Sequence, residues 1–269
     1  MHRDQAAIYS EKYFSYVGKM DSPDTSLGKG LRLFRLIAED RGRTPFRSLV
    51  ERAGIPPSTA HRLLRSMRNQ GLVGQVGAGR YDIGLELVDL CDGRSRNEHL
   101  ANVARHVLNN MARRLGLTVH LGVLEDAMVT YLVKSEGKTS CGGANFTREG
   151  MQLEAYCSAV GRVLLAGLEE KEQDAYLSDG PFVDLTARTI TCPTELHQII
   201  KTVSAHGFAK DDREIADDLL CFAVPLRSGS GEVVAGISVS LTWPPDNILN
   251  EQELVRQLEK VSRKITARL

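Results

Sequence analysis

The chain has 269 residues, which at roughly 100 to 200 residues per domain predicts two domains, each able to bury its own core. Hydrophobic residues make up 42% and charged residues 25% of it, a composition that excludes a disordered or fibrous protein. No apolar run approaches the roughly 18 residues that cross a bilayer, and the N-terminus lacks the apolar segment of a secretory signal, so we expect a cytoplasmic protein with no membrane partner. The five cysteines form no CxxC pair, which argues against a disulfide framework and a zinc ribbon.

The net charge of the whole chain is zero, but the charges are segregated along the sequence. Residues 27–84 carry 11 Lys and Arg against 4 Asp and Glu, whereas residues 85–269 carry 20 against 26. A basic segment followed by an acidic one indicates that a polyanion such as nucleic acid meets only the first.

Residues 1–26 end in the polar run DSPDTS, so we expect an N-terminal arm that stops at a domain boundary. A first helix is predicted from Leu27 to about Gly42. Apolar residues recur along it at spacings of three and four, as on the inward face of an amphipathic helix. This predicted inward face consists of Leu27, Leu31, Phe34 and Ala38.

A second helix is predicted from Thr44, as N-cap, with Pro45 at the favoured first helical position and Gly54 at the C-terminal turn. A third helix follows, from about residue 57 to Gln70, and then the strand-like runs GLVGQV and RYDIG, joined by a turn at residues 77–79. Three helices and a hairpin within residues 27–84 are the layout of a winged helix-turn-helix.

The third helix is the one that a helix-turn-helix places in the major groove of DNA, with its N-terminal residues toward the bases. We therefore expect Ser58, Thr59, His61 and Arg62 to face base edges, and Arg65 and Arg68 to lie nearer the phosphates. Arg80 on the wing could reach phosphate or the minor groove, and Thr44 and Ser48 could touch phosphate. The alternative is that the arginines form an ordinary solvated helix face and that Arg80 is a plain hairpin charge.

Residues 85–97 are predicted to form a linker helix, and residues 98–269 a second domain. A helix from about Glu98 to Leu115 has a continuous apolar stripe, and with the linker helix it is expected to make the contacts of an oligomer. Hairpins are predicted at residues 118–134 and 221–243, and helices at 158–168, 169–177 and 193–205; Asn250 and Glu253 suggest a capping box on a final helix. Strands interleaved with helices predict a mixed α/β or α+β domain with an antiparallel sheet.

Two serines lie on one face of the run ISVSL, because Ser238 and Ser240 are two residues apart on a predicted strand. Hydroxyl groups on a buried apolar strand need hydrogen-bond partners. A polar ligand is one such partner, and neighbouring backbone or water is the alternative.

The stretch IPPSTAHRLLRSMRNQGLVGQVGAGRYDIG resembles the winged helix of the IclR family of bacterial transcription regulators. The resemblance continues through CSAVGRVLLAGL, TARTITCPTELHQIIKTVSAHGFAKDDRE, CFAVPLRSGSGEVVAGISVS and the final helix, so it covers nearly everything from Leu27 onward. It implies a GAF-like effector domain that binds a small organic acid or aromatic metabolite. The segment ADDLLC departs from the family pattern, since Asp218 stands where glycine is usual, and this puts the shape of the loop and the ligand's identity in doubt.

The same resemblance implies a role in the effector pocket for six residues. They are Ala159, Val160, Asp211, Cys221, Ser238 and Ser240. Backbone N–H groups of Ala159 and Val160 would meet the ligand at a helix N-terminus, which is a natural site for a carboxylate. Asp211 could instead be a turn residue, and Cys221 a small core hydrophobe.

The leading hypothesis is a ligand-controlled regulator with operator DNA and a small carboxylate as partners, acting as a homodimer or homotetramer without cofactor or metal. One rival is an enzyme with Cys221 or a serine as nucleophile, assisted by His120, His197 or His206. However, the chain contains no GxSxG, P-loop, HExxH or strand-linked GxGxxG motif. The other rival, a purely structural DNA-binding protein, would not need the large acidic second domain.

Overall fold

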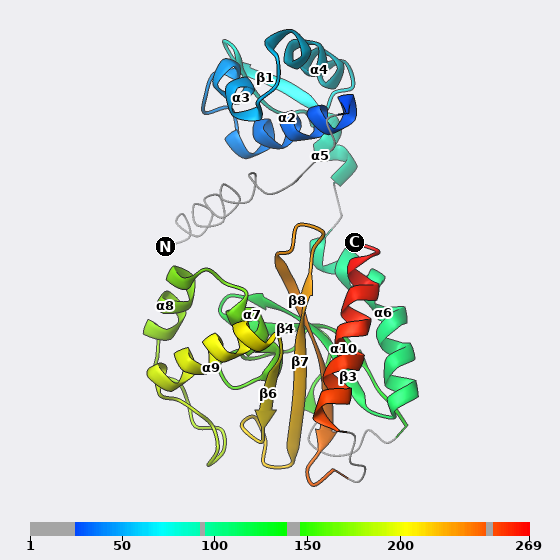
Figure 1. Ribbon diagram of the computed structural model, residues 1–269, viewed down its shortest axis with the longest axis vertical. Coiled ribbons are helices and arrows are strands. Elements are labelled where there is room, and N and C mark those ends of the chain that lie inside the picture. The colour runs from blue at the N-terminus through cyan, green and yellow to red at the C-terminus, as the bar shows by residue number, and fades with distance from the viewer. Residues whose placement is uncertain (1–24, 92–94, 139–145, 246–249) are drawn as a thin grey trace. The chain divides into compact units, whose positions relative to one another are not determined.

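The computed structural model describes residues 25–91, 95–138, 146–245 and 250–269. The chain divides into two compact units between residues 94 and 95, and each unit is drawn with its elements labelled in Figure 1. Of the predicted N-terminal arm, residues 1–26, only Thr25 and Ser26 lie within the described residues, where they cap and begin a helix.

The N-terminal unit has the predicted arrangement of helices followed by a hairpin. Its elements are α2 (Ser26–Asp40), α3 (Phe46–Ala53), α4 (Pro57–Asn69), β1 (Val73–Gly77), β2 (Arg80–Ile83) and α5 (Leu85–Cys91), with β1 and β2 antiparallel. Leu33 of α2, Leu49 of α3 and Leu64 of α4 meet in one hydrophobic core. The winged helix-turn-helix fold predicted for this segment is confirmed.

The apolar pattern predicted for the first helix matches its buried face only in part: Phe34 and Ala38 are half-buried and Phe34 packs against the core, but Leu27 and Leu31 do not. Leu27 is 72% and Leu31 58% exposed, and the core is filled instead by Leu33, Leu36 and Ile37. Two apolar stripes run along this helix, and packing against α3 and α4 selects the one that periodicity did not favour. The stripe that contains Leu27 and Leu31 therefore remains on the surface of the chain.

The second helix also begins later than predicted. It starts at Phe46, with Pro45 as an N-cap that makes no side-chain cap bond. Thr44 is not the cap, because its N–H and Oγ1 donate to the two carboxylate oxygens of Asp40 at 2.8 and 2.6 Å. The contact ties the end of α2 to the start of α3.

The C-terminal unit is built on a six-stranded antiparallel sheet in the order β5-β4-β3-β8-β7-β6. Its strands are β3 (Thr118–Glu125), β4 (Met128–Ser135), β5 (Gln152–Glu154), β6 (Ala209–Asp212), β7 (Leu219–Arg227) and β8 (Val233–Thr242). Its helices are α6 (Arg96–Leu115), α7 (Ala159–Ala166), α8 (Glu170–Ser178), α9 (Pro193–His206) and α10 (Glu251–Thr266). The prediction of a mixed α/β domain with an antiparallel sheet is confirmed.

Helices cover both faces of this sheet. Helices α6 and α10 lie side by side against one face, in the larger core cluster, while α7 and α9 share the cluster on the other face (Figure 1). Helix α7 packs on β7 and β8. Its first turn therefore lies over β8, the strand that carries both serines.

Three expectations for this unit are corrected. The apolar stripe of α6 is buried in the unit's own core, so it is not available for contact with another chain. Strand β6 was not expected, because its short run AKDD is polar. Asn250 does cap the last helix, but its side chain accepts from the N–H of Gln252, and the reciprocal bond with Glu253 that defines a capping box does not form.

None of the described helices has the length and apolar character required to cross a membrane.

Candidate functional site

Helix α4 presents a basic outer face. Ala60 and Leu64 are buried beneath it, whereas His61, Arg62, Arg65 and Arg68 are exposed, as predicted. Ser58 is exposed and Thr59 half-buried at its first turn. Arg62 and Arg65 form no ion pair with any other residue in the part of the chain that the structure describes.

The turn and the wing fix the position of α4. Gly54 ends α3 with a φ of 63°, a left-handed conformation that favours glycine. Gly79, at the tip of the hairpin, accepts a hydrogen bond from the N–H of Phe46 at 2.8 Å. At the rear of α4, the Arg68 guanidinium lies 5.7 Å from the centre of the Tyr81 ring on the wing. Arg80 is exposed next to that tyrosine.

A small cavity that opens to solvent lies between the sheet of the C-terminal unit and the start of α7. All six residues expected in an effector pocket line it. The full lining is His120, Tyr131, Phe146, Thr147, Leu153, Ser158, Ala159, Val160, Asp211, Ile215, Leu219, Cys221, Ser238 and Ser240.

The strand register explains why polar groups gather in this cavity. Directly paired residues of neighbouring antiparallel strands face the same side of a sheet. Ser240 pairs with Cys221 on β7, which in turn pairs with Asp211 on β6, and Ser238 pairs with His120 on β3. A row of polar side chains therefore crosses four strands on the face that α7 covers.

Two glycines bring α7 close to the sheet. Gly122 and Gly236 are partners on β3 and β8, and a Cβ atom at either would lie only 2.9 or 3.0 Å from Cγ1 of Val160. Ser158 caps α7 and accepts the N–H of Gly161 at 3.0 Å. The first turn of α7 is thus held over the serines, with the N–H groups that begin a helix directed toward that end of the cavity.

Asp211 is buried, with 1% of its surface exposed. It accepts the N–H of Glu214 at 2.8 Å, but burial outweighs this bond and raises the pKa of its carboxyl to about 7. A neutral carboxyl carries an O–H donor, so Asp211 can donate to an anion where an ionised aspartate would repel it.

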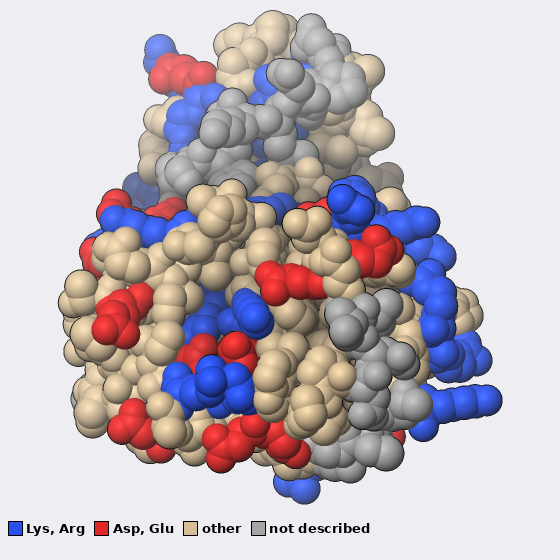
Figure 2. Space-filling model, turned by 60° about the horizontal axis from the view of Figure 1, so that its bottom comes forward, with Lys and Arg blue, Asp and Glu red and all other residues tan. Residues whose placement is uncertain are grey.

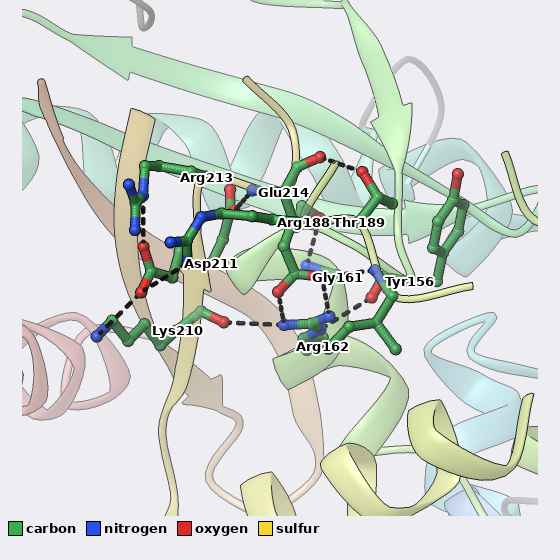
Figure 3. Close-up of polar contacts among 12 residues, drawn as sticks. Tyr156, Gly161, Arg162, Arg188, Thr189, Lys210, Asp211, Arg213 and Glu214 are labelled. Carbon is green, nitrogen blue, oxygen red and sulfur yellow. Dashed lines mark hydrogen bonds and ion pairs between the residues drawn. The ribbon is translucent and has the colours of Figure 1, made fainter. Parts of the chain in front are cut away.

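A buried ion pair supports this side of the cavity. Arg162 of α7 and Glu214, which follows β6, form a bidentate pair whose second contact, Nη2 to Oε2, is 2.6 Å (Figure 3). Arg162 also donates to the carbonyls of Tyr156 and Lys210. Glu214 is the same residue whose N–H binds Asp211, so the pair links α7 to the Asp211 segment. The sequence alone does not reveal the pair of Arg162 and Glu214, because the two residues are 52 positions apart.

Two further groups show that the cavity is poorly suited to nucleophilic catalysis. The thiol of Cys221 lies 3.2 Å from the Ser240 hydroxyl, and burial raises its pKa far above the ordinary value, so it stays protonated. Burial and the nearby Lys134 lower the pKa of His120 to about 3. No cluster of three or more potential metal ligands occurs among the described residues.

In Figure 2 acidic and basic side chains lie next to one another over the middle of this unit, while basic side chains gather along the right edge of the view. Around β6, Lys210 and Arg213 both lie within 4 Å of the Asp212 carboxylate.

Comparison with known proteins agrees with both units. Residues 95–267 match the family described as bacterial transcriptional regulator IclR C-terminal, and residues 26–77 match the IclR helix-turn-helix domain. The transcriptional regulator KdgR of Escherichia coli is 28% identical, over 93% of this chain and 95% of its own. The transcriptional repressor IclR of the same organism is 29% identical, over 80% and 79%. The crystal structure of Thermotoga maritima IclR is similar with a TM-score of 0.60, at 26% identity, over 90% of this chain and 98% of that one.

Proposed function

Because the chain belongs to the IclR family of bacterial transcriptional regulators, we propose that a small carboxylate bound in its C-terminal unit controls its affinity for operator DNA. The DNA-binding role is assigned to residues 27–84, the ligand-binding role to residues 98–269, and residues 85–97 connect the two. The relatives named above are transcriptional regulators and not enzymes.

One observation carries the choice of a carboxylate: several hydrogen-bond donors meet in one cavity without a metal or a lysine among its lining residues. The Ser238 side chain lines this cavity and is only 2% exposed. The Asp211 carboxyl, when protonated, and the N–H groups of Ala159 and Val160 add further donors. Together they can satisfy the oxygens of one anionic group.

On the DNA side, we propose that Ser58, Thr59, His61 and Arg62 face the bases. Arg65, Arg68 and Arg80 then lie at phosphates or the minor groove. The exposed guanidinium groups of α4 support this assignment, because each phosphate that a basic side chain contacts releases a counterion and adds to the affinity.

We also propose that the chain acts as a dimer or as a pair of dimers. A single recognition helix contacts too few base pairs for specificity, and two half-sites require twofold symmetry. Exposed apolar residues on α5 support the proposal, since Leu85 is 80%, Val88 47% and Leu90 54% exposed in the isolated chain.

A thermal-shift series tests the carboxylate site. Ligands that bind only the folded protein raise its stability in proportion to ln(1 + [L]/Kd). The series contains short aliphatic acids and benzoates, including 4-hydroxybenzoate, with which a solved relative from Microbacterium hydrocarbonoxydans is complexed. Each acid is compared with its own amide, which has the same shape without the charge. At least one acid should raise the melting temperature while its amide does not; equal shifts for every acid and amide would contradict the proposal.

A further inference from the structure

The charges of the C-terminal unit are distributed unevenly over its fold. Residues 96–115, which form α6, and residues 251–269, which include α10, carry 9 Lys and Arg against 4 Asp and Glu. Residues 116–250 carry 10 against 19. The two helices lie side by side against one face of the sheet, and the edge that they occupy in Figure 1 is the edge where basic side chains gather in Figure 2. The acidic total of this unit therefore hides a basic surface.

Helical spacing places the basic residues of α10 and of the chain end on one side. Arg256, Lys260, Arg263, Lys264 and Arg268 follow one another at intervals of four, three, one and four residues, and residues three or four apart are neighbours on a helix surface. All five are exposed, while the apolar residues of the same helix are buried against the sheet. At a rise of 1.5 Å per residue, the stripe is about 18 Å long.

Helix α6 widens this stripe. Arg113 and Arg114 are exposed at its end, and Nη2 of Arg114 donates to Oε1 of Gln257 on α10 at 2.5 Å. Arg96 is exposed at its start. We call the exposed basic residues of both helices and the chain end the α6–α10 surface. It consists of Arg96, Arg113, Arg114, Arg256, Lys260, Arg263, Lys264 and Arg268.

Ion pairs within the chain use little of this charge. The arginines at 256 and 263 lie 3.9 and 3.8 Å from glutamates on the same helix, and their side chains are 72% and 73% exposed. Such exposed pairs contribute little and are screened by salt. Lys260 and Lys264 form no ion pair with another residue in the described parts of the chain.

Helix dipoles explain only part of the pattern. Basic residues in the last turn of a helix are stabilised by its dipole, which accounts for Arg113 and Arg114 in α6 and for Arg263 and Lys264 in α10. Lys260 lies in the interior of α10, where the dipole effect has fallen off. Its exposure and charge therefore indicate an anionic partner outside the chain.

Duplex DNA fits the α6–α10 surface better than a second copy of the chain does. The acidic helix α8 belongs to the core on the opposite face of the sheet. A contact between α8 of one copy and α10 of the next would be heterologous and would add further copies without closing by twofold symmetry. Over the roughly 18 Å of the stripe, by contrast, duplex DNA presents about ten phosphate charges.

The family's own ligand supplies this polyanion. The N-terminal unit matches the IclR helix-turn-helix domain, and the C-terminal unit is joined to it in one chain. A tethered module meets the same DNA at a high effective concentration, so even weak phosphate contacts add to the affinity.

We propose that the α6–α10 surface is a second DNA-binding surface, which contacts phosphates beyond the base pairs that α4 recognises. The contact depends on charge and not on base sequence. It also does not depend on which ligand, if any, occupies the cavity on the other face of the sheet.

A matched pair of double variants tests this inference on the full-length protein. Lys260→Gln with Lys264→Gln removes two charges from the α6–α10 surface. Lys171→Gln with Lys201→Gln removes two exposed lysine charges from α8 and α9 and is the control. Each protein is titrated, across a salt series, with a duplex selected from a random pool and with the same duplex extended at both ends by about two helical turns.

The variant at residues 260 and 264 should bind the extended duplex about tenfold more weakly than the wild type, with a slope of log K against log salt that is lower by about one to two. It should bind the short duplex like the wild type, and the control should match the wild type on both. No loss, a loss of the same size on both duplexes, or an equal loss in the control would overturn the inference. A lower oligomeric mass of this variant in light scattering would also overturn it, because the surface would then contact another copy.

Discussion

Single substitutions in α4 test the proposed division between base recognition and phosphate binding. Arg62 is exposed near the front of α4, while Arg68 lies at its rear against Tyr81. We predict that Arg62→Ala lowers affinity for a duplex selected from a random pool and reduces the preference for that duplex, at a cost of about 1 to 3 kcal/mol. Arg68→Ala should weaken binding to all sequences alike and lower the slope of log K against log salt by about one.

Binding curves across a salt series, with the selected duplex and a scrambled one, measure both effects. Glu51→Ala, on the exposed side of α3, is a control of opposite charge. Because it removes a charge that would repel DNA, it should not lower the affinity for either duplex. If the two arginine variants lost affinity and preference in the same way, the division of roles along α4 would be wrong.

Asp211 gives the C-terminal unit a specific dependence on pH. The folded-state pKa of about 7 lies above the ordinary 3.8, so between these values the folded chain holds a proton that the unfolded chain has released. Its contribution to the free energy of unfolding is therefore full below about pH 4 and is lost as the pH rises through about 7. Asp211→Asn keeps an acceptor for the Glu214 N–H but cannot ionise, so it should lack this loss.

We predict that the free energy of unfolding of Asp211→Asn, minus that of the wild type, increases from pH 5 to pH 7 by up to about 1.4 kcal/mol per pH unit. Urea unfolding at pH 5, 6, 7 and 8 measures it, and other titrating groups cancel in the difference. A difference that stays constant over this range would show that Asp211 ionises normally.

Between elements, the contact that matters most for the cavity is the pair between α7 and the segment after β6. The side chains of Arg162 and Glu214 are only 4% and 6% exposed, so removing one leaves a buried, uncompensated charge. We predict that Arg162→Met or Glu214→Gln destabilises the unit by about 3 to 5 kcal/mol, and that the double variant loses less than the sum.

The half-exposed pair Arg105 and Glu149 is the matched control, since Arg105→Met should cost about 1 kcal/mol or less. Denaturant unfolding of the four variants gives the coupling energy of the buried pair. Additive losses at residues 162 and 214 would mean that the two side chains do not act together.

How well the sequence predicts each element depends on how local its signals are. Helix α4 has prolines at its start and alternating inward and outward residues, so its limits and its exposed face were predictable. The register of Ser238 and Ser240 followed from the twofold repeat of a strand, and the structure places both in one cavity.

Other features depend on contacts that are distant in the sequence. Helix α2 has two apolar stripes, and only packing against α3 and α4 decides which is buried. Strand β6 has only four residues, and its Asp211 lines the cavity rather than a hydrophobic core. It therefore lacks the apolar pattern by which a strand is predicted. From the sequence alone, His120 is a candidate base for a nucleophile. That its side chain lies on the same face of the sheet as the two serines follows only from the pairing of β3 with β8.

For the whole molecule, the apolar residues left exposed on α2 and α5 support the proposed oligomer. The stripe of α6 is buried, which leaves Leu85 and Val88 of α5 and Leu27 and Leu31 of α2 at the surface. We predict that the wild type is a dimer or larger at micromolar concentration, and that Leu85→Ser with Val88→Ser shifts it toward the monomer.

Multi-angle light scattering over a concentration series measures this shift. Val183→Ser, which also replaces an exposed apolar residue but in the other unit, is the control. A wild-type monomer that still bound the selected duplex tightly would contradict the proposed symmetry.

In the proposed function, occupancy of the cavity changes the affinity for DNA. A ligand can shift such an equilibrium only by its difference in affinity for the two states, typically about 1 to 3 kcal/mol, or about 5- to 150-fold. Ser240→Ala removes one hydroxyl from the cavity. Ser262→Ala is its control, because Ser262 is equally buried but donates to the Pro225 carbonyl outside the cavity.

The most direct measurement is the Kd for the selected duplex, with and without the acid that binds the wild type most tightly, for the wild type and both serine variants. We expect the acid to change the Kd of the wild type and of Ser262→Ala by about 5-fold or more. Ser240→Ala should keep the ligand-free Kd but lose this response. A normal response in Ser240→Ala, or a loss of DNA binding without ligand, would contradict the account and place the effector elsewhere.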